Sequence, residues 1–150
     1  MLTRAADYAT RVMIHLASLP DGTRVQRTAL AEATDVPESF MSKVLQGLVR
    51  ARLISSRSGV NGGFELAVPP SEVSLLDVIE AIDGPLQLNV CVGPPRGCGR
   101  QAWCGAHTVW TEAQDAMTRI LRRATVAEMA AKSTSRRAAA RKSVKAFQLR

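Results

Sequence analysis

The three cysteines of the chain fall within one glycine- and proline-rich stretch. They are Cys91, Cys98 and Cys104, and His107 follows the last of them by three positions. Thiolates are soft ligands that suit iron–sulfur clusters, Cu(I) and Zn(II), and three cysteines with one histidine also satisfy tetrahedral zinc. An odd number of cysteines fits a disulfide framework poorly. We therefore expect a metal or cluster site here, with three reduced thiols that hold no metal as the alternative.

A second group of polar side chains follows a helix-turn-helix pattern and a short hairpin. Pro37 suits the first turn of a helix, because its missing N–H has no partner to lose there. The major groove of B-DNA admits one α-helix, whose early polar or cationic side chains can reach base edges, and a glycine-rich hairpin tip can approach phosphates or enter the minor groove. The residues that we expect at such an interface are Thr28, Glu38, Ser39, Ser42, Lys43, Arg57, Ser58 and Asn61. A helix-turn-helix that contacts protein instead is the alternative.

Apolar periodicity and turn residues predict the elements that position both groups. Helices are expected at residues 3–19, from about 28 to 34, from 37 into the low fifties, at 74–85 and at about 105–123, with strands at 53–56 and 64–68 and a short helix at 125–131. Thr28 can cap the second helix, and Ser74 and Asp77 form a capping pair. The predicted fold is mainly α with a small β-hairpin wing. It divides into a winged helix-turn-helix (1–84), a cysteine loop (85–104), a long helix with a short terminal helix (105–131) and a tail (132–150).

Basic residues are concentrated at the C-terminal end. Residues 132–150 hold seven basic residues and no acid, which equals the whole net charge of +7. Few large apolar side chains occur there, which predicts a disordered tail that attracts phosphates nonspecifically or stays a solvated end without a role. No apolar run is long enough for a membrane span and the N-terminus lacks the apolar centre of a signal peptide, so we expect a cytoplasmic protein. We find no Cys/His/acid arrangement on a recognisable catalytic scaffold, so an enzyme is not expected.

Several segments together resemble the Rrf-two family of winged-helix regulators, which includes the iron–sulfur cluster regulator IscR, the nitric-oxide sensor NsrR and the iron-responsive regulator RirA. The segments are LTRAADYATRVMIHLA, PESFMSKVLQGLVRARLISSRSGVNGGFEL, SLLDVIEAIDG, the three cysteines, CGAHTVW and TVAEM. The similarity covers residues 2 to about 131 and leaves the tail outside it.

The resemblance implies a homodimer in which the long helices of two subunits pack against each other. A seam of apolar residues at near-heptad spacing fits that packing, namely Trp110, Ala113, Met117, Ile120, Leu121 and Ala124. It also implies a transcriptional regulator of a double-stranded DNA operator, with repression as the expected direction of control. The expected signal is iron–sulfur status, redox state or nitric oxide.

The resemblance further implies an iron–sulfur cluster on Cys91, Cys98 and Cys104. In relatives with a [2Fe–2S] cluster, a histidine at the position of His107 completes the site. In nitric-oxide sensors with a [4Fe–4S] cluster, an aspartate at the position of Asp7 does so from the partner subunit. Both residues are present, so the cluster type and the fourth ligand stay open. A zinc-stabilised DNA-binding or structural module, colourless and redox-silent, is the alternative with the same ligands.

Overall fold

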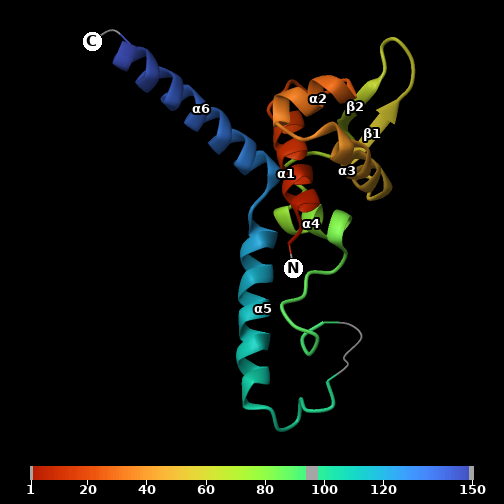
Figure 1. The fold of residues 1–150 in the computed structure, drawn as a ribbon, viewed down its shortest axis with the longest axis vertical. Helices are drawn as coiled ribbons and strands as arrows, with labels where there is room; N and C mark the ends of the chain where they lie inside the picture. The colour runs from red at the N-terminus through yellow and green to blue at the C-terminus, as the bar shows by residue number, and fades with distance from the viewer. Residues whose placement is uncertain (1, 94–97, 149–150) are drawn as a thin grey trace.

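The computed structural model describes residues 2–93 and 98–148, with side chains described as far as Arg137. Its elements are α1 (Arg4–Ala17), α2 (Arg27–Thr34), α3 (Glu38–Arg50), β1 (Ile54–Arg57), β2 (Gly63–Leu66), α4 (Leu75–Asp83), α5 (Gly105–Arg123) and α6 (Val126–Gln148). The first four helices and the hairpin form a body from which α5 and α6 extend in different directions (Figure 1). The predicted mainly α fold with a β-hairpin wing is confirmed.

The core of the body lies where α1 packs against α2, α3 and α4. Val12, Met13, Leu30, Met41 and Leu48 are fully buried there. Each such side chain stabilises the fold by roughly 1.5–3 kcal/mol through removal of apolar surface from water. Because one face of α3 is committed to this core, its opposite face stays at the surface.

Side-chain caps fix the starts of α1 and α4. The Thr3 hydroxyl accepts from the Ala6 N–H at 3.3 Å and donates to Asp83 Oδ1 at 2.6 Å, so the cap of α1 is tied to the last residue of α4. Ser74 and Asp77 cap each other's backbone N–H groups in a capping box, which confirms their predicted pairing. These caps satisfy N–H groups that a helix start leaves without partners.

The second helix starts one residue earlier than the sequence predicts. Gln26 occupies the N-cap position of α2 without a side-chain cap, and Thr28 lies inside the helix, so the predicted capping role of Thr28 is wrong. A two-residue bridge lies just upstream, in which Val25 and Phe64 exchange backbone hydrogen bonds of 3.0 and 2.9 Å. Because this bridge keeps the chain extended at Val25, it limits how early the helix can begin, and the helix starts two residues later, at Arg27.

The predicted hairpin is present as the antiparallel pair β1 and β2. Its register runs from Ile54 opposite Leu66 to Arg57 opposite Gly63, which leaves residues 58–62 as the tip. Gly63 adopts a φ of +140°, and a Cβ there would lie 2.7 Å from the carbonyl oxygen of Val25. Glycine at this position therefore permits the bridge between the wing and the start of α2.

Helix α5 joins the body mainly through its C-terminal end. Backbone hydrogen bonds of 2.8 Å run from Leu75 N to Ala124 O and from Val126 N to Val73 O, next to the start of α4. None of the α5 side chains is buried, and the helix extends from the body beside the loop that carries the cysteines (Figure 1). This arrangement leaves Val109, Trp110 and Ile120 of α5 exposed.

Helix α6 differs from its predicted form. A short helix followed by a disordered tail is expected from the sequence, whereas the structure continues a single helix to Gln148. Residues 126–148 contain no glycine or proline and are rich in alanine, lysine and arginine, which are among the strongest helix formers. The scarcity of large apolar side chains predicts disorder, whereas the helix-forming composition accounts for the continuous helix. Among the described residues, no helix is long and apolar enough to cross a membrane.

Candidate DNA-binding surface and cysteine loop

The exposed face of α3 carries the polar side chains that the sequence assigns to DNA. Met41, Val44, Leu45 and Leu48 turn inward. Ser39, Lys43, Gln46 and Arg50, at spacings of three or four residues, are exposed, and Ser42 is half-buried beside them. Gln46 and Arg50 are absent from the predicted DNA-contacting residues, although they continue the same stripe.

The wing and α2 flank this face. Arg57, Ser58 and Asn61 are exposed at the hairpin tip, and Thr28 is exposed on the first turn of α2. All eight residues predicted to meet DNA therefore lie on α2, α3 or the wing. A hollow of about 480 Å³ lies between α3 and the wing. The polar residues that line it come from α2 (Arg27), from α3 (Ser42, Gln46 and Arg50) and from β1 (Ser56).

Arg27 links the start of α2 to the start of α3, and it is not among the residues that the sequence predicts for DNA binding. Its Nη2 and Nε lie 2.7 and 3.1 Å from Glu38 Oε2, and its Nη1 donates to Ser42 Oγ at 3.0 Å. Two of the side chains predicted to read DNA are thus held by one guanidinium. The signal that could have found this contact is a lone basic residue at the first position of α2, where a helix-turn-helix brings two helix starts together.

The cysteine loop carries three reduced thiols. Cys91, Cys98 and Cys104 are free and half-buried, and Cys104 is the N-cap residue of α5 without a side-chain cap hydrogen bond. Gln101 Nε2 donates to the carbonyl oxygen of Cys91 at 2.9 Å, which ties the two ends of the loop together. Among the residues described, however, no three His, Cys, Asp or Glu side chains are gathered closely enough to hold a metal ion.

The two candidates for a fourth ligand differ in their surroundings. Nδ1 of His107 is buried and, among the described residues, has no hydrogen-bond partner. An unsatisfied buried nitrogen costs free energy, so such an atom calls for a ligand or another partner. Asp7 Oδ2, in contrast, lies 2.7 Å from Arg11 Nη2 on the same helix. Three thiols and one free imidazole nitrogen have the donor chemistry of an iron–sulfur site.

Gln114 connects the segment before the cysteines to α5. Its Nε2 donates to Leu86 O at 2.7 Å, and its Oε1 accepts from Leu88 N at 2.9 Å. The loop is therefore attached to α5 through Gln114 as well as at its end, where Cys104 caps the helix. The loop and α5 are thus in direct contact at two places.

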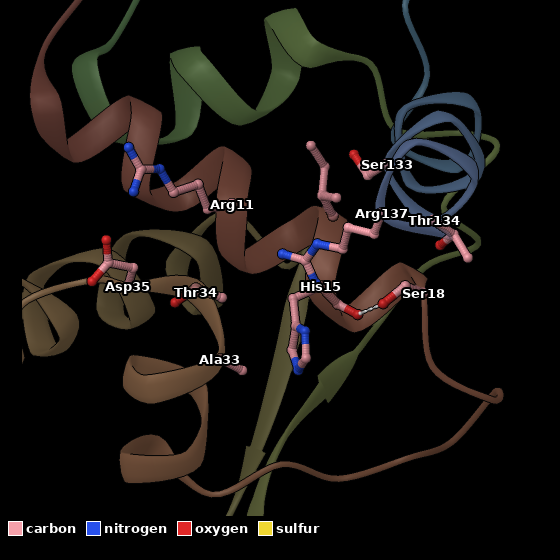
Figure 2. A pocket seen from close by; sticks show the side chains of 10 residues that line it. Arg11, His15, Ser18, Ala33, Thr34, Asp35, Ser133, Thr134 and Arg137 are labelled. Carbon is pink, nitrogen blue, oxygen red and sulfur yellow. Dashed lines mark hydrogen bonds between the residues drawn. The ribbon is translucent and has the colours of Figure 1, made fainter. Parts of the chain in front are cut away.

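The other histidine, His15, lies far from the thiols in the sequence and occupies a separate hollow of about 340 Å³ (Figure 2). Side chains of α1, the end of α2 and α6 surround it, including Arg11, Asp35 and Arg137. Burial, and to a lesser extent the charge of Arg137, lowers the pKa of His15 from its ordinary value of 6.5. None of the residues predicted for DNA or metal binding lines this hollow.

The body, wing and exposed face of α3 define a winged-helix DNA-binding protein with an additional long helix. Comparison with known proteins gives the family. The chain belongs to the Rrf2 family of iron-dependent transcriptional regulators, whose family model matches residues 2–132. It is therefore a DNA-binding transcriptional regulator, as the sequence predicts.

Individual relatives agree with this assignment. A candidate HTH-type transcriptional regulator of Mycobacterium tuberculosis, Rv1287, is 35% identical over 133 residues, which span 86% of this chain and 80% of that protein. The fold is similar to CymR, the global cysteine regulator of B. subtilis, with a TM-score of 0.72 at 21% identity over 88% of this chain and 97% of CymR. It is also similar to IscR of T. potens, with a TM-score of 0.71 at 21% identity over 89% of this chain and 88% of IscR.

Proposed function

We propose that this regulator is a cytoplasmic homodimeric repressor that senses iron–sulfur status, redox state or nitric oxide through a cluster on its cysteine loop. The observation that carries the proposal is the buried, unpartnered Nδ1 of His107, three residues after Cys104 in a chain with three reduced thiols. The family's description as iron-dependent supports the same conclusion.

The dimer would form along α5. Val109, Trp110 and Ile120 are exposed large apolar residues on this helix, with Ile120 at 66% exposure, and Met117 and Leu121 are half-buried. Contiguous apolar surface of this kind marks a protein interface in soluble proteins. The partner's α5 is the expected occupant, because the seam repeats at near-heptad spacing along one helix.

Cys91, Cys98 and Cys104 would hold the cluster, with His107 as the fourth ligand. His107 is favoured over Asp7 because the Asp7 carboxylate already has a cationic partner on its own helix. When bound, the cluster supplies a centre that responds to oxidation, loss of iron or nitric oxide. The loop must close further to bring the four donors together, since the described residues do not gather them.

Closure of the loop would be transmitted to the DNA-binding surface through contacts within the chain. Gln114 and Cys104 attach the loop to α5, and α5 joins the body beside α4. A shift of α5 against its partner changes the separation of the two α3 helices. Two-fold operators present half-sites about one helical turn apart, so a small change in that separation alters affinity.

The test is anaerobic purification followed by iron and sulfide counting and a visible spectrum. We expect a brown protein that loses most of its iron and sulfide in Cys98→Ala and His107→Ala and keeps them in Asp7→Ala. His15→Ala is the matched control, because it removes the chain's other histidine away from the loop. A colourless protein that binds zinc would contradict the proposal, and unchanged cluster content in both His107→Ala and Asp7→Ala would exclude both fourth ligands.

A further inference from the structure

Arg27 occupies a position from which it can control how α3 meets DNA. It lies outside α3, yet its guanidinium contacts two α3 side chains on the surface that faces the groove, at 2.7 Å to Glu38 and 3.0 Å to Ser42. Arg27 and Glu38 are about half exposed, at 47% and 50% of their side chains. Exposed ion pairs of this kind contribute little to folding stability. The contact is therefore available for a role in recognition.

We propose that Arg27 is a positioning residue of the DNA-reading surface, which neutralises Glu38 and sets the direction of the Ser42 hydroxyl. The inference rests on the DNA-binding function and assigns a residue that determines its specificity. Its two parts, charge and direction, can be tested separately.

The charge part follows from the place of Glu38. A carboxylate in the first turn of a helix that enters the major groove would lie in the negative potential of the duplex, and like charges brought together at an interface cost free energy. Arg27 donates to the same carboxylate oxygen from both Nε and Nη2 and offsets that charge locally. Without Arg27, the Glu38 carboxylate would repel the DNA.

The direction part follows from hydrogen-bond chemistry. A serine hydroxyl has one proton to donate and an oxygen that accepts. The Ser42 oxygen accepts from Arg27 Nη1, so its proton points away from the guanidinium and is free to donate. A donor in the major groove favours bases with acceptor edges, such as N7 and O6 of guanine or O4 of thymine. Arg27 therefore biases the base that Ser42 selects.

The experiment selects duplexes from a random-sequence pool with the purified full-length protein, at one fixed salt concentration, and sequences them. Ser42→Ala identifies the base position that depends on this hydroxyl. We expect Arg27→Ala to lower affinity for the selected duplex by about tenfold, the scale of unfavourable charge juxtaposition at an interface, and to weaken the preference at that same position. Glu38→Gln alone is measured as the baseline for the double variant, because it removes the carboxylate charge and leaves Arg27 in place.

The double variant Arg27→Ala/Glu38→Gln separates positioning from a simple phosphate contact. Removing both charges should restore most of the affinity but not the preference at the Ser42 position. If Arg27 only contacts a phosphate, the double variant stays weak and the salt slope falls by about one unit with base preference intact, which would overturn the proposal. A wild type that selects no sequence would instead contradict the DNA-binding function itself.

A matched control is available in the segment that precedes α2. Arg24 pairs with Glu65 of β2 at 2.9 Å, so Arg24→Ala also removes one positive charge and one ion pair. It has no contact with α3 side chains among the described interactions. Arg24→Ala should leave the preference at the Ser42 position unchanged, and an equal change in both variants would rule out a specific role for Arg27. Thermal unfolding of each variant shows that the fold is retained.

Discussion

Lys43 stands exposed on the second turn of α3, on the face turned away from the core. A lysine at this place can donate to the acceptor edge of guanine or contact a phosphate. We predict that Lys43→Ala weakens binding to the selected duplex by about 1–3 kcal/mol and relaxes the preference at one position in each half-site. Fluorescence anisotropy with matched and mismatched duplexes measures both effects. Lys132→Ala, an exposed charge on α6, is the control, and unchanged affinity and preference in Lys43→Ala would remove it from the reading surface.

The sequence alone predicts which face of an element a side chain occupies better than it predicts which side chains contact each other. The polar residues of α3 could be predicted because the buried stripe through Val44 and Leu48 leaves only one face for DNA. Arg27 could not be assigned to Glu38 in the same way, since their contact depends on how the turn between α2 and α3 places two helix starts. The proposed preference for His107 over Asp7 likewise rests on the Arg11 ion pair and the buried Nδ1, which the sequence does not reveal.

At the scale of elements, the packing of α6 against α1 should respond to pH. The pKa of His15 is lowered, chiefly by burial and then by Arg137, so the folded protein favours the neutral imidazole. Protonation then favours unfolding, and the stability that depends on neutral His15 is present above about pH 6.5 and is lost as pH falls below that value. We predict that His15→Gln is less sensitive to acid in this range than the wild type.

Urea unfolding at a series of pH values from 5 to 8 measures this difference. The free energy of unfolding of the wild type should fall faster on acidification than that of His15→Gln. Above pH 7 the two free energies should change with pH in the same way. His107→Gln is the comparison variant for the second histidine of the chain. Parallel curves of the wild type and His15→Gln over the whole range would show that His15 does not contribute to the pH dependence.

Elements with strong local signals were predicted well. The hairpin could be read from alternating residues around a glycine-rich tip, and the Ser74–Asp77 capping box from its spacing. The sequence places the start of α2 at Thr28 on local capping preference, whereas the chain leaves the bridge between Val25 and Phe64, 39 residues apart, and enters the helix at Arg27 without a side-chain cap. The length of α6 differs because the scarcity of large apolar side chains predicts disorder, although its alanine, lysine and arginine residues are strong helix formers.

At the scale of the whole molecule, the chain separates DNA contact from the cysteine loop. The exposed face of α3 and the wing belong to the body, whereas the segment that carries the cysteines runs beside α5, at the other end of the molecule (Figure 1). The contacts of Gln114 and the backbone bonds between α5 and the start of α4 connect the two regions. Sequence could predict this order of parts, but not the route between them, because that route consists of side-chain contacts to backbone atoms.

The proposed function requires that the state of the cysteine loop changes the affinity of the protein for DNA. The most direct measurement is the affinity of the anaerobically loaded protein for its selected two-fold duplex, before and after removal of iron, at one salt concentration. We predict a change of fivefold or more, the lower end of typical allosteric coupling, and no such change in Cys98→Ala. Equal affinity of the loaded and stripped wild-type protein would contradict the account.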